Sequence, residues 1–381
     1  MSGNVYDVAI VGAGIVGLAH ALAAARLGKR VVVIDRDAQA NGASIRNFGF
    51  VTVTGQQAGA CWERALRSRD VWAEVAPQAG IAIEQEGLLV VARRPEAMAV
   101  LEAFRATSMG AECSLLPARA VRERLPCVRA GDLAGGLWSP LERRVESRLA
   151  IPKLAAWLEA AHGVTFRRGT AVRAVEPPRI ETADGRIEAE ACIVCPGDDF
   201  TGLFPERLAA YGLTRCKLHM LRLADPGTRL PGAVMADLSL VRYLGYAELP
   251  EARALRARLE REQPEALANG VHLIVVQSAD GSLVVGDSHH YAPTPDPFAP
   301  EAVDDVILDE FRRVLALDVR VTERWTGTYA SAQDRLMLVD RPEDAVRLVV
   351  VTSGTGASTA FGIAEEVIAD LFGSTGGRKV A

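Results

Sequence analysis

The sequence lacks the features that mark membrane-spanning and nucleic-acid-binding chains. No apolar stretch reaches the roughly 18 uninterrupted residues that a transmembrane helix needs, and the apolar run from Val8 begins too soon after Met1 to leave a charged signal region. Its 43 basic and 48 acidic residues are interleaved, without a basic stripe that would suit a phosphate backbone. We therefore expect a cytoplasmic protein with no membrane and no nucleic acid among its partners.

Cysteine is scarce and shows no disulfide framework. The six cysteines are scattered through 381 residues, as is typical of chains whose thiols stay reduced. Cys192 and Cys195 form a C-x-x-C, but they lie in an apolar, strand-like run that would send their side chains to opposite faces of a sheet. Because a redox pair normally opens a helix, we interpret this motif as part of a buried strand. We predict no metal site.

Glycine, in contrast, is plentiful and regularly spaced near the N-terminus. Gly12, Gly14 and Gly17 follow the G-x-G-x-x-G spacing, between an apolar run and a stretch rich in Ala and Leu. The apolar pattern of the first forty residues predicts a strand, a helix and a second strand, at 7–11, 15–27 and 30–34. This order of elements favours a βαβ unit that binds a dinucleotide.

Each residue of this unit has a separate task. Gly12 permits the tight turn, Gly14 lets the backbone approach a pyrophosphate, and Gly17 lets the helix pack closely on the strand. The phosphates then meet free N–H groups at the helix N-terminus. The second strand ends at Asp35, whose carboxylate would accept hydrogen bonds from a ribose and repel a 2′-phosphate. The unit therefore predicts FAD or NAD, and argues against NADP.

The rest of the chain alternates between helical and strand-like segments and is long enough for two domains. Asp184-Gly185 and Asp280-Gly281 are expected to turn between antiparallel strands, and the Pro-rich stretch 293–300 is expected to be a loop. Helices are expected at 62–75, 95–109, 151–162, 251–263, 301–315 and from about 361 to 372, and strands at 87–92, 164–168, 171–175, 179–182, 187–194, 217–223, 271–277 and 282–286.

Several motifs resemble those of one flavoenzyme family. The longest are Gly42-Ala-Ser-Ile-Arg-Asn-Phe-Gly49 and Ser353-Gly-Thr-Gly-Ala-Ser-Thr-Ala-Phe-Gly362. With the N-terminal unit and the segments 194–197, 280–286 and 327–334, they resemble the D-amino-acid oxidase superfamily, and glycine and sarcosine oxidases in particular. The stretches 44–49, 145–148 and 216–219 resemble the branch of that superfamily associated with phosphonate breakdown.

This resemblance implies an α/β fold with α+β elements, in which a mixed sheet roofs the substrate over the flavin. A Rossmann-like FAD-binding domain would comprise residues 1–55, 143–213 and 325–381, and a mixed-sheet substrate domain would comprise residues 56–142 and 214–324. The N-terminal N–H groups of the last helix would face the negative charge of the reduced flavin. The residues expected to bind FAD are Gly12, Gly14, Ile15, Val16, Gly17, Asp35, Arg36, Ser44, Arg46, Asn47, Val172, Gly197, Gly354, Thr355, Gly356, Ala357 and Ser358.

The chain departs from the family at four positions that carry its chemistry. Glycine oxidases have a carboxylate-binding arginine where this chain has Tyr329, and sarcosine oxidases have a lysine where it has Ser358. The substrate therefore either lacks an α-carboxylate or has its anion bound from another wall, for which Arg46 is our candidate. Gly327 replaces the flavin-linking cysteine of sarcosine oxidases, so we expect noncovalent FAD. Val284 replaces their oxygen-activating lysine, which makes rapid use of O2 less certain.

We expect FAD-dependent oxidation of a small amine, with O2 as acceptor and an aminophosphonate such as 2-aminoethylphosphonate or its N-methyl derivative as substrate. Alternatives are an amino-acid oxidase, a dehydrogenase that reduces a quinone or carrier protein, and a flavin-binding or tRNA-modifying relative. No catalytic base is assigned, because flavin chemistry on amines depends mainly on positioning, and a homo-oligomer is left open. Candidate substrate-binding residues are Arg46, His219, Tyr243, Tyr246, His289, Tyr329 and Thr355, with His290 beside them.

Overall fold

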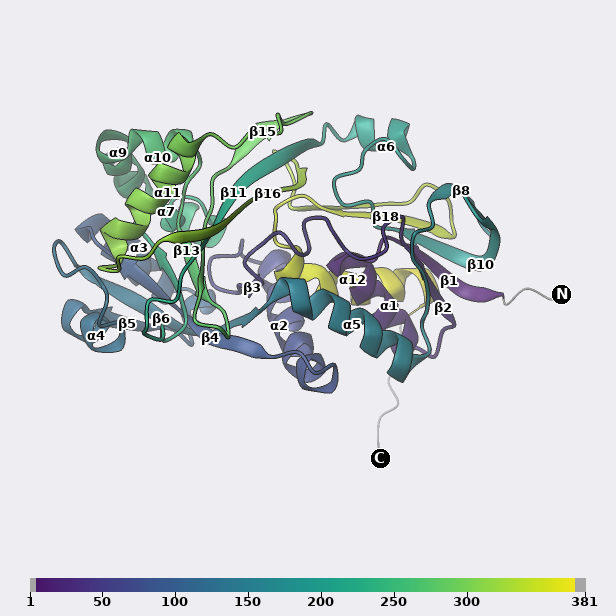
Figure 1. Cartoon of the computed structure of the whole chain (residues 1–381), viewed down its shortest axis with the longest axis horizontal. Helices are drawn as coiled ribbons and strands as arrows, with labels where there is room; N and C mark the ends of the chain where they lie inside the picture. Colours follow the sequence, from purple (N-terminus) through teal and green to yellow (C-terminus); the bar gives the residue numbers. More distant parts are fainter. Residues whose placement is uncertain (1–4, 374–381) are drawn as a thin grey trace.

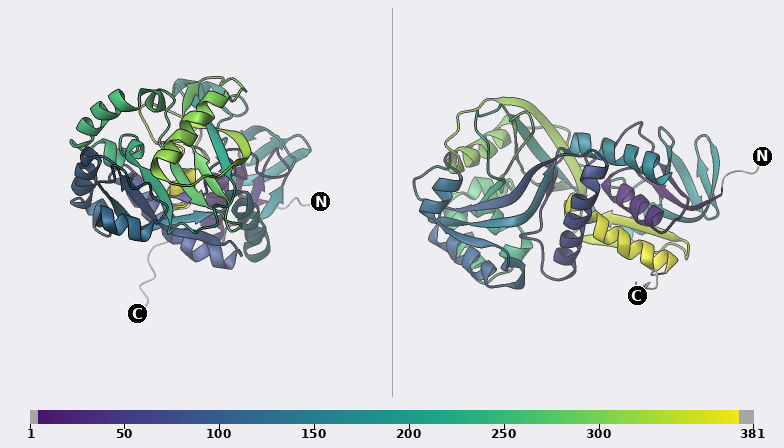
Figure 2. Two further views of the ribbon diagram at one scale, coloured as in Figure 1. Left: turned by 60° about the vertical axis from the view of Figure 1, so that its left-hand side comes forward. Right: turned by 90° about the horizontal axis from the view of Figure 1, so that it is seen from below.

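The computed structural model describes residues 5–373 as two mixed sheets with helices packed on them (Figure 1). Seen from below, the sheets form two lobes, and the long strands near the middle of the molecule run toward both (Figure 2). The fold is mixed α/β, as the sequence predicts. Among the described residues, no helix combines the length and apolar character that crossing a membrane requires.

The first sheet has the order β17-β18-β10-β1-β2-β7, with β9 paired to β10 and β8 to β9. The strands β1, β2, β7, β10 and β18 run parallel, and most of their residues are buried, as is typical of a parallel sheet covered on both faces. Their bounds are β1 (Tyr6–Val11), β2 (Val31–Ile34), β7 (Thr165–Arg167), β8 (Val172–Glu176), β9 (Arg179–Thr182), β10 (Gly185–Val194), β17 (Met337–Asp340) and β18 (Val346–Val351).

Four helices share an apolar core with one face of this sheet: α1 (Ile15–Arg26), α2 (Ala60–Gln78), α5 (Ser147–His162) and α12 (Gly356–Phe372). The opposite face packs against β8, β9 and the short helix α6 (Pro205–Ala210). Cys192 lies in the second of these cores, and Cys195 packs against the first. The two thiols therefore face opposite sides of the sheet, which confirms that this C-x-x-C belongs to a buried strand.

The second sheet has the order β15-β11-β14-β13-β12-β4-β6-β3, with β16 paired to β11 and β5 to β6. The predicted hairpin at Asp280-Gly281 is confirmed, because β13 and β14 pair antiparallel on either side of it, and the turn at Asp184-Gly185 likewise joins β9 to β10. The bounds are β3 (Phe50–Val51), β4 (Ile83–Ala92), β5 (Ser114–Pro117), β6 (Gly135–Val145), β11 (Thr214–Leu223), β12 (Ala233–Ala236), β13 (Ile274–Gln277), β14 (Leu283–Gly286), β15 (His290–Ala292) and β16 (Val321–Ser331).

The remaining helices belong to the lobe of the second sheet, where side chains of α3, α9 and α11 enter its apolar core. Their bounds are α3 (Pro95–Arg105), α4 (Ala118–Arg124), α7 (Asp237–Leu240), α8 (Leu244–Ala247), α9 (Ala252–Glu262), α10 (Pro264–Ala268) and α11 (Glu301–Val314).

Several helix ends differ from the prediction by a few residues; α2 spans 60–78 where 62–75 is expected, and α5 begins at Ser147 where 151 is expected. Two further differences have a clear local reason. The helix expected at 95–109 ends at Arg105, because the Thr107 hydroxyl donates to the Phe104 carbonyl and accepts from the Gly110 N–H, which starts a separate 3-10 turn. The last helix begins at Gly356, about five residues earlier than expected. Its first turn consists of small residues, so the apolar pattern did not reveal it.

The strands of the first sheet all come from the three ranges predicted for the FAD-binding domain. Two predicted boundaries, after residues 142 and 324, fall inside β6 and β16, which each continue through them as one strand. The division of the chain into domains stays a prediction.

Candidate functional site

A cavity of about 770 Å³ extends from the glycine turn of the first sheet to the underside of the second. Its volume is in the range of cofactor and substrate sites. The carboxyl ends of β1, β2 and β10 open into it, where ligands bind in parallel sheets of this kind. Leu218 of β11 and Ile274 of β13 contribute from the second sheet.

In the turn formed by residues 12–17, a side chain at any of the three glycines would collide with a neighbouring atom. Gly12 has φ +105°, and a Cβ there would lie 2.5 Å from the Cys195 carbonyl oxygen. A Cβ on Gly17 would lie 1.9 Å from the Gly12 carbonyl oxygen, so α1 packs directly on the turn. At Gly14 the nearest atom is the Ser44 Oγ, at 2.9 Å from such a Cβ. The turn therefore keeps its backbone open to the cavity.

Asp35 supports this turn as well as lining the cavity. Its Oδ2 accepts a hydrogen bond of 2.6 Å from the Ala13 N–H, and its Oδ1 accepts one of 2.8 Å from the Asp37 N–H. The carboxylate thus links the end of β2 to the turn that follows β1. Each oxygen still has acceptor capacity for a ribose hydroxyl.

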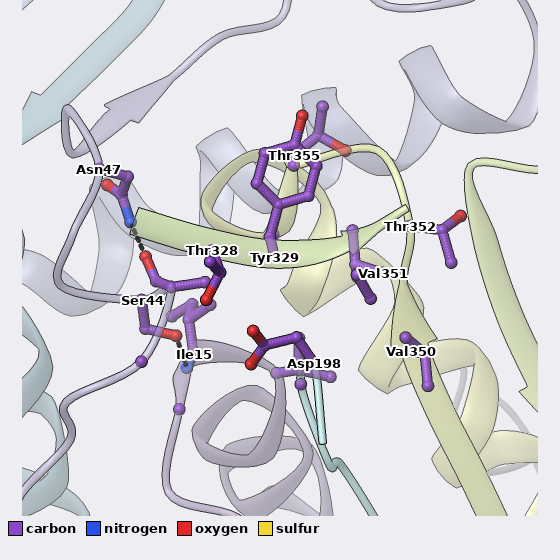
Figure 3. A pocket seen from close by; sticks show the side chains of 18 of the residues that line it. Ile15, Ser44, Asn47, Asp198, Thr328, Tyr329, Val350, Val351, Thr352 and Thr355 are labelled. Carbon is purple, nitrogen blue, oxygen red and sulfur yellow. Dashed lines mark hydrogen bonds between the residues drawn. The ribbon is translucent and has the colours of Figure 1, made fainter. Parts of the chain in front are cut away.

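The segment 42–49 forms the cavity wall beside the turn (Figure 3). Ser44 Oγ accepts from the Ile15 N–H at 2.9 Å, and Asn47 Nδ2 donates to the Ala43 carbonyl at 2.6 Å. Ser147 Oγ donates to Asn47 Oδ1 at 2.8 Å. The stretches 44–49 and 145–148, which both resemble the phosphonate-associated branch, are therefore in contact.

The N-terminus of α12 opens into the same cavity. Thr355 is its N-cap, and no side chain caps its first N–H groups. Gly354, with φ +72°, brings the backbone against the ring of Tyr329, which rises from β16 toward this loop (Figure 3). Like α12, α1 begins without a side-chain cap other than the Ser44 contact. Two helix N-termini therefore face one cavity, an arrangement that fits a dinucleotide carrying negative charge.

Every residue predicted to bind the cofactor lines this cavity, and so do the substrate candidates Arg46, Tyr243, His289, Tyr329 and Thr355. Ser358 is buried and its Oγ accepts from the Thr52 N–H at 2.9 Å. The hydroxyl is therefore committed to the backbone of the neighbouring segment.

Two substrate candidates, His219 and Tyr246, do not line the cavity, contrary to the expectation from the sequence. Successive residues of a strand face opposite sides, so Leu218 lines the cavity while His219 points away and contacts Asp304 of α11 at 3.1 Å. The Tyr246 ring packs against Phe104 with centroids 4.6 Å apart. His290 also lies outside the cavity lining, with Nε2 3.1 Å from Asn269 Oδ1.

Sequence reasoning missed four polar residues of the roof: Arg242, His272, Asp287 and Tyr291. They come from four separate places, between α7 and α8, before β13, after β14 and within β15. Arg242 Nη2 donates to the Tyr291 hydroxyl at 2.9 Å. The only signal in the sequence was the polar run that follows the apolar strand ending at Gly286.

Asp287 and His289 carry shifted pKa values. Burial acts to raise the pKa of Asp287, but His289, His272 and Arg242 together lower it to about 2. Burial lowers the pKa of His289 to about 3, against the raising effect of Asp287. At neutral pH the roof therefore presents an ionised carboxylate beside a neutral imidazole.

The family model described as DAO, FAD dependent oxidoreductase, matches residues 7–371. No match was found among the curated proteins. Three solved structures are similar in fold. Glycine oxidase from Geobacillus kaustophilus has a TM-score of 0.74 at 19% identity, covering 96% of this chain and 94% of that one. L-proline dehydrogenase from P. horikoshii has a TM-score of 0.75 at 16% identity, with 97% and 94% covered.

The third structure is the dithionite-reduced L-α-glycerophosphate oxidase from Mycoplasma pneumoniae with FAD bound. Its TM-score is 0.75 at 15% identity, and the match covers 97% of this chain and 95% of that one. At these identities the three likenesses describe the fold.

Proposed function

The chain belongs to the DAO family of FAD-dependent oxidoreductases, and from that premise we propose that it oxidises a small amine bearing a phosphonate group. FAD would supply the hydride acceptor for the C–H bond next to the amine, after the substrate nitrogen has lost its ammonium proton to water. The resulting imine is hydrolysed to an aldehyde and an amine or ammonia, and the two electrons reduce O2 to H2O2. We propose 2-aminoethylphosphonate or its N-methyl derivative as substrate, noncovalent FAD and a cytoplasmic location.

The substrate proposal rests on Tyr329 and Ser358, which occupy the positions of the arginine of glycine oxidases and the lysine of sarcosine oxidases. Tyr329 offers a phenol in place of a guanidinium, and the Ser358 hydroxyl is held by the Thr52 N–H. Neither can grip a planar carboxylate through two parallel hydrogen bonds. A phosphonate is tetrahedral and carries up to two charges, so it suits several donors that approach from different directions. Arg46, Tyr329 and Thr355 offer such donors around the cavity.

A structural neighbour supports this choice. The M. pneumoniae enzyme with the same fold is an L-α-glycerophosphate oxidase, whose substrate carries a tetrahedral phosphorus anion. The other neighbours include enzymes named for amino acids, and a glycine-like or sarcosine-like substrate is the alternative within the same reaction class.

A dehydrogenase that passes electrons to another acceptor is the second candidate function. It is favoured by Val284, an apolar and buried residue where sarcosine oxidases have their oxygen-activating lysine. One neighbour is named as a dehydrogenase, of L-proline. Stoichiometric H2O2 formed during turnover in air supports the oxidase, whereas turnover that needs a quinone and yields no peroxide supports the dehydrogenase.

The direct test is a contest between substrates. The oxidised holoenzyme is mixed anaerobically with glycine, sarcosine, D-alanine, 2-aminoethylphosphonate or N-methyl-2-aminoethylphosphonate, and loss of the flavin absorbance is followed in time. We expect one of the two phosphonates to bleach the flavin fastest. If an amino acid is faster than both, the aminophosphonate proposal is wrong and the amino-acid alternative replaces it.

A further inference from the structure

The roof of the cavity carries two groups of opposite charge that do not pair with each other. Asp287 is 5% exposed, and Arg242 is half-buried beside the rim residue Tyr291. Both line the cavity, and within residues 5–373 neither has the other as an ion-pair partner. Charges removed from water in this way are costly unless another charge covers them. The arrangement calls for a ligand with one charge of each sign.

The acceptor side of the roof consists of Asp287 and His289. His289 Nδ1 lies 2.9 Å from the Gly270 carbonyl oxygen, which can only accept, so Nδ1 carries the proton of the neutral ring. The lone pair of Nε2 then faces Asp287 Oδ2 at 3.6 Å. Two acceptor atoms thus lie close together without a donor hydrogen between them. A group with several N–H donors and a positive charge would satisfy both.

His272 belongs to the same side of the roof. Its Nε2 is 2.9 Å from Asp287 Oδ1, and this contact helps to lower the pKa of Asp287. Asp287 is ionised at neutral pH because its pKa is lowered to about 2. The carboxylate therefore retains capacity for a donor that enters from the cavity.

The donor side of the roof consists of Arg242 and Tyr291, with Tyr329 close by. Burial acts to lower the pKa of Arg242, but Tyr291 and Tyr329 raise it by more, so the guanidinium stays charged. Burial raises the pKa of Tyr329 well above its usual value, so its phenol stays a donor. Within the described residues, the Arg242 guanidinium donates one hydrogen bond, from Nη2 to the Tyr291 hydroxyl.

We propose that this roof binds a zwitterionic substrate, with its amino group on Asp287 and His289 and its anionic group on Arg242 and Tyr291. This rests on the proposed function and deepens it, because it makes Arg242, and not Arg46, the principal residue that binds the substrate anion. Specificity then comes from the separation of two charges, which a small amine without an anionic group cannot match.

The same acceptors have the spacing of a metal site, since His272, Asp287 and His289 offer ligand atoms within 4.8 Å of one another. The cluster contains one carboxylate, and Arg242 places a positive charge on the same roof, so the negative charge there matches one positive charge. We therefore favour a singly charged ammonium over a divalent cation as the occupant.

The test uses probes that each carry charge of one sign. Ethylphosphonate has only the anion, and tert-butylamine has only the cation and no C–H next to nitrogen that could be oxidised. Each is titrated into the oxidised holoenzyme, and the change in the flavin spectrum gives its Kd. The variants are Arg242→Met and Asp287→Asn, with Arg312→Met and Asp309→Asn as matched controls on the exposed surface of α11.

Arg242→Met should weaken ethylphosphonate binding more than tenfold and leave the Kd of tert-butylamine within about twofold. Asp287→Asn should do the reverse, and both controls should match the wild type. Arg242→Lys keeps the positive charge and should recover part of the ethylphosphonate affinity. If Arg242→Met fails to retain FAD, this variant still tests the role of the charge. If acetate has a lower Kd than ethylphosphonate, the proposed positions of the two charges are retained, but the phosphonate substrate is wrong.

Three results would overturn the inference. The first is an unchanged Kd for ethylphosphonate in Arg242→Met, and the second is an unchanged Kd for tert-butylamine in Asp287→Asn. The third is about one equivalent of tightly bound zinc or iron in the purified wild type that Asp287→Asn loses. That last result would make the acceptor cluster a metal site.

Discussion

At the scale of single residues, the proposed cofactor site depends on backbone that no side chain covers. Gly12, Gly14 and Gly17 each meet a neighbour at 2.9 Å or less when a Cβ is added. At Gly12 and Gly17 the neighbour is backbone, so substitution disturbs the turn itself, whereas at Gly14 it is the Ser44 hydroxyl. A substitution at Gly14 should therefore affect FAD binding more than it affects the folding of the turn.

Gly14→Val should abolish FAD retention. The added side chain would displace Ser44 Oγ from the Ile15 N–H and fill the space in which a pyrophosphate approaches the turn. The measurement is the ratio of flavin to protein absorbance after gel filtration. Gly131→Val is the matched control, because a Cβ there meets nothing within 4 Å. Full flavin occupancy in Gly14→Val would show that the site has been misplaced.

Asp35→Ala should weaken FAD binding by tenfold or more. It removes the charged acceptor for the ribose, where each hydrogen bond to a charged group contributes about 1.5 to 3 kcal/mol, and it also releases the Ala13 N–H that holds the turn. Titration of the apoprotein with FAD, followed by quenching of flavin fluorescence, gives the Kd. An unchanged Kd would exclude the ribose role.

At the scale of elements, α10 and α11 pack through a buried carboxyl. Gln263 Nε2 donates to Glu310 Oε2 at 2.5 Å, and Glu310 is 3% exposed. Burial raises the pKa of Glu310 to about 7 from its usual 4.5. Between these two values the folded chain holds a proton that the unfolded chain releases, so stability falls as pH rises through this window.

Glu310→Gln should therefore stabilise the protein at pH 8 and have little effect near pH 4.5. The shift corresponds to about 3 kcal/mol as an upper value at high pH, because each pKa unit is worth about 1.4 kcal/mol. Thermal unfolding at both pH values gives the comparison, with the exposed Glu260→Gln in α9 as control. An equal effect of Glu310→Gln at both pH values would show that the carboxyl does not titrate in this window.

At the scale of the whole molecule, the cavity exists only because the two sheets meet. The first sheet brings two helix N-termini and the carboxyl ends of its strands, and the second brings the polar roof. β16 belongs to the second sheet, and its C-terminal residues 327–331 line the cavity. This one strand therefore connects the two halves of the cavity.

Denaturation of the protein should release chemically intact FAD. Gly327, at the tethering position of sarcosine oxidases, offers no thiol. Cys195 lines the cavity, but burial raises the pKa of its thiol and so leaves it a poor nucleophile. Acid precipitation followed by fluorescence of the supernatant measures the released flavin. Flavin that stays with the precipitated protein would refute noncovalent binding.

Local sequence by itself determined the half of the cavity that we propose binds FAD. The order of strand, turn and helix, the glycine spacing and Asp35 lie within about thirty consecutive residues, and their geometry follows from backbone sterics and hydrogen bonding over that short range. Family resemblance extended this prediction to the segments 44–49 and 353–358, which also line the cavity.

Only the tertiary structure decided the half of the cavity that we propose binds the substrate. Arg242, His272, Asp287 and Tyr291 come from four places in the chain, and each is an ordinary polar residue in its local context. Strand alternation turned His219 away from the cavity, and packing against Phe104 took Tyr246 into the core. Which polar side chains share a roof depends on the pairing of β11, β13, β14 and β15, and these contacts between distant segments leave no periodic pattern in the sequence.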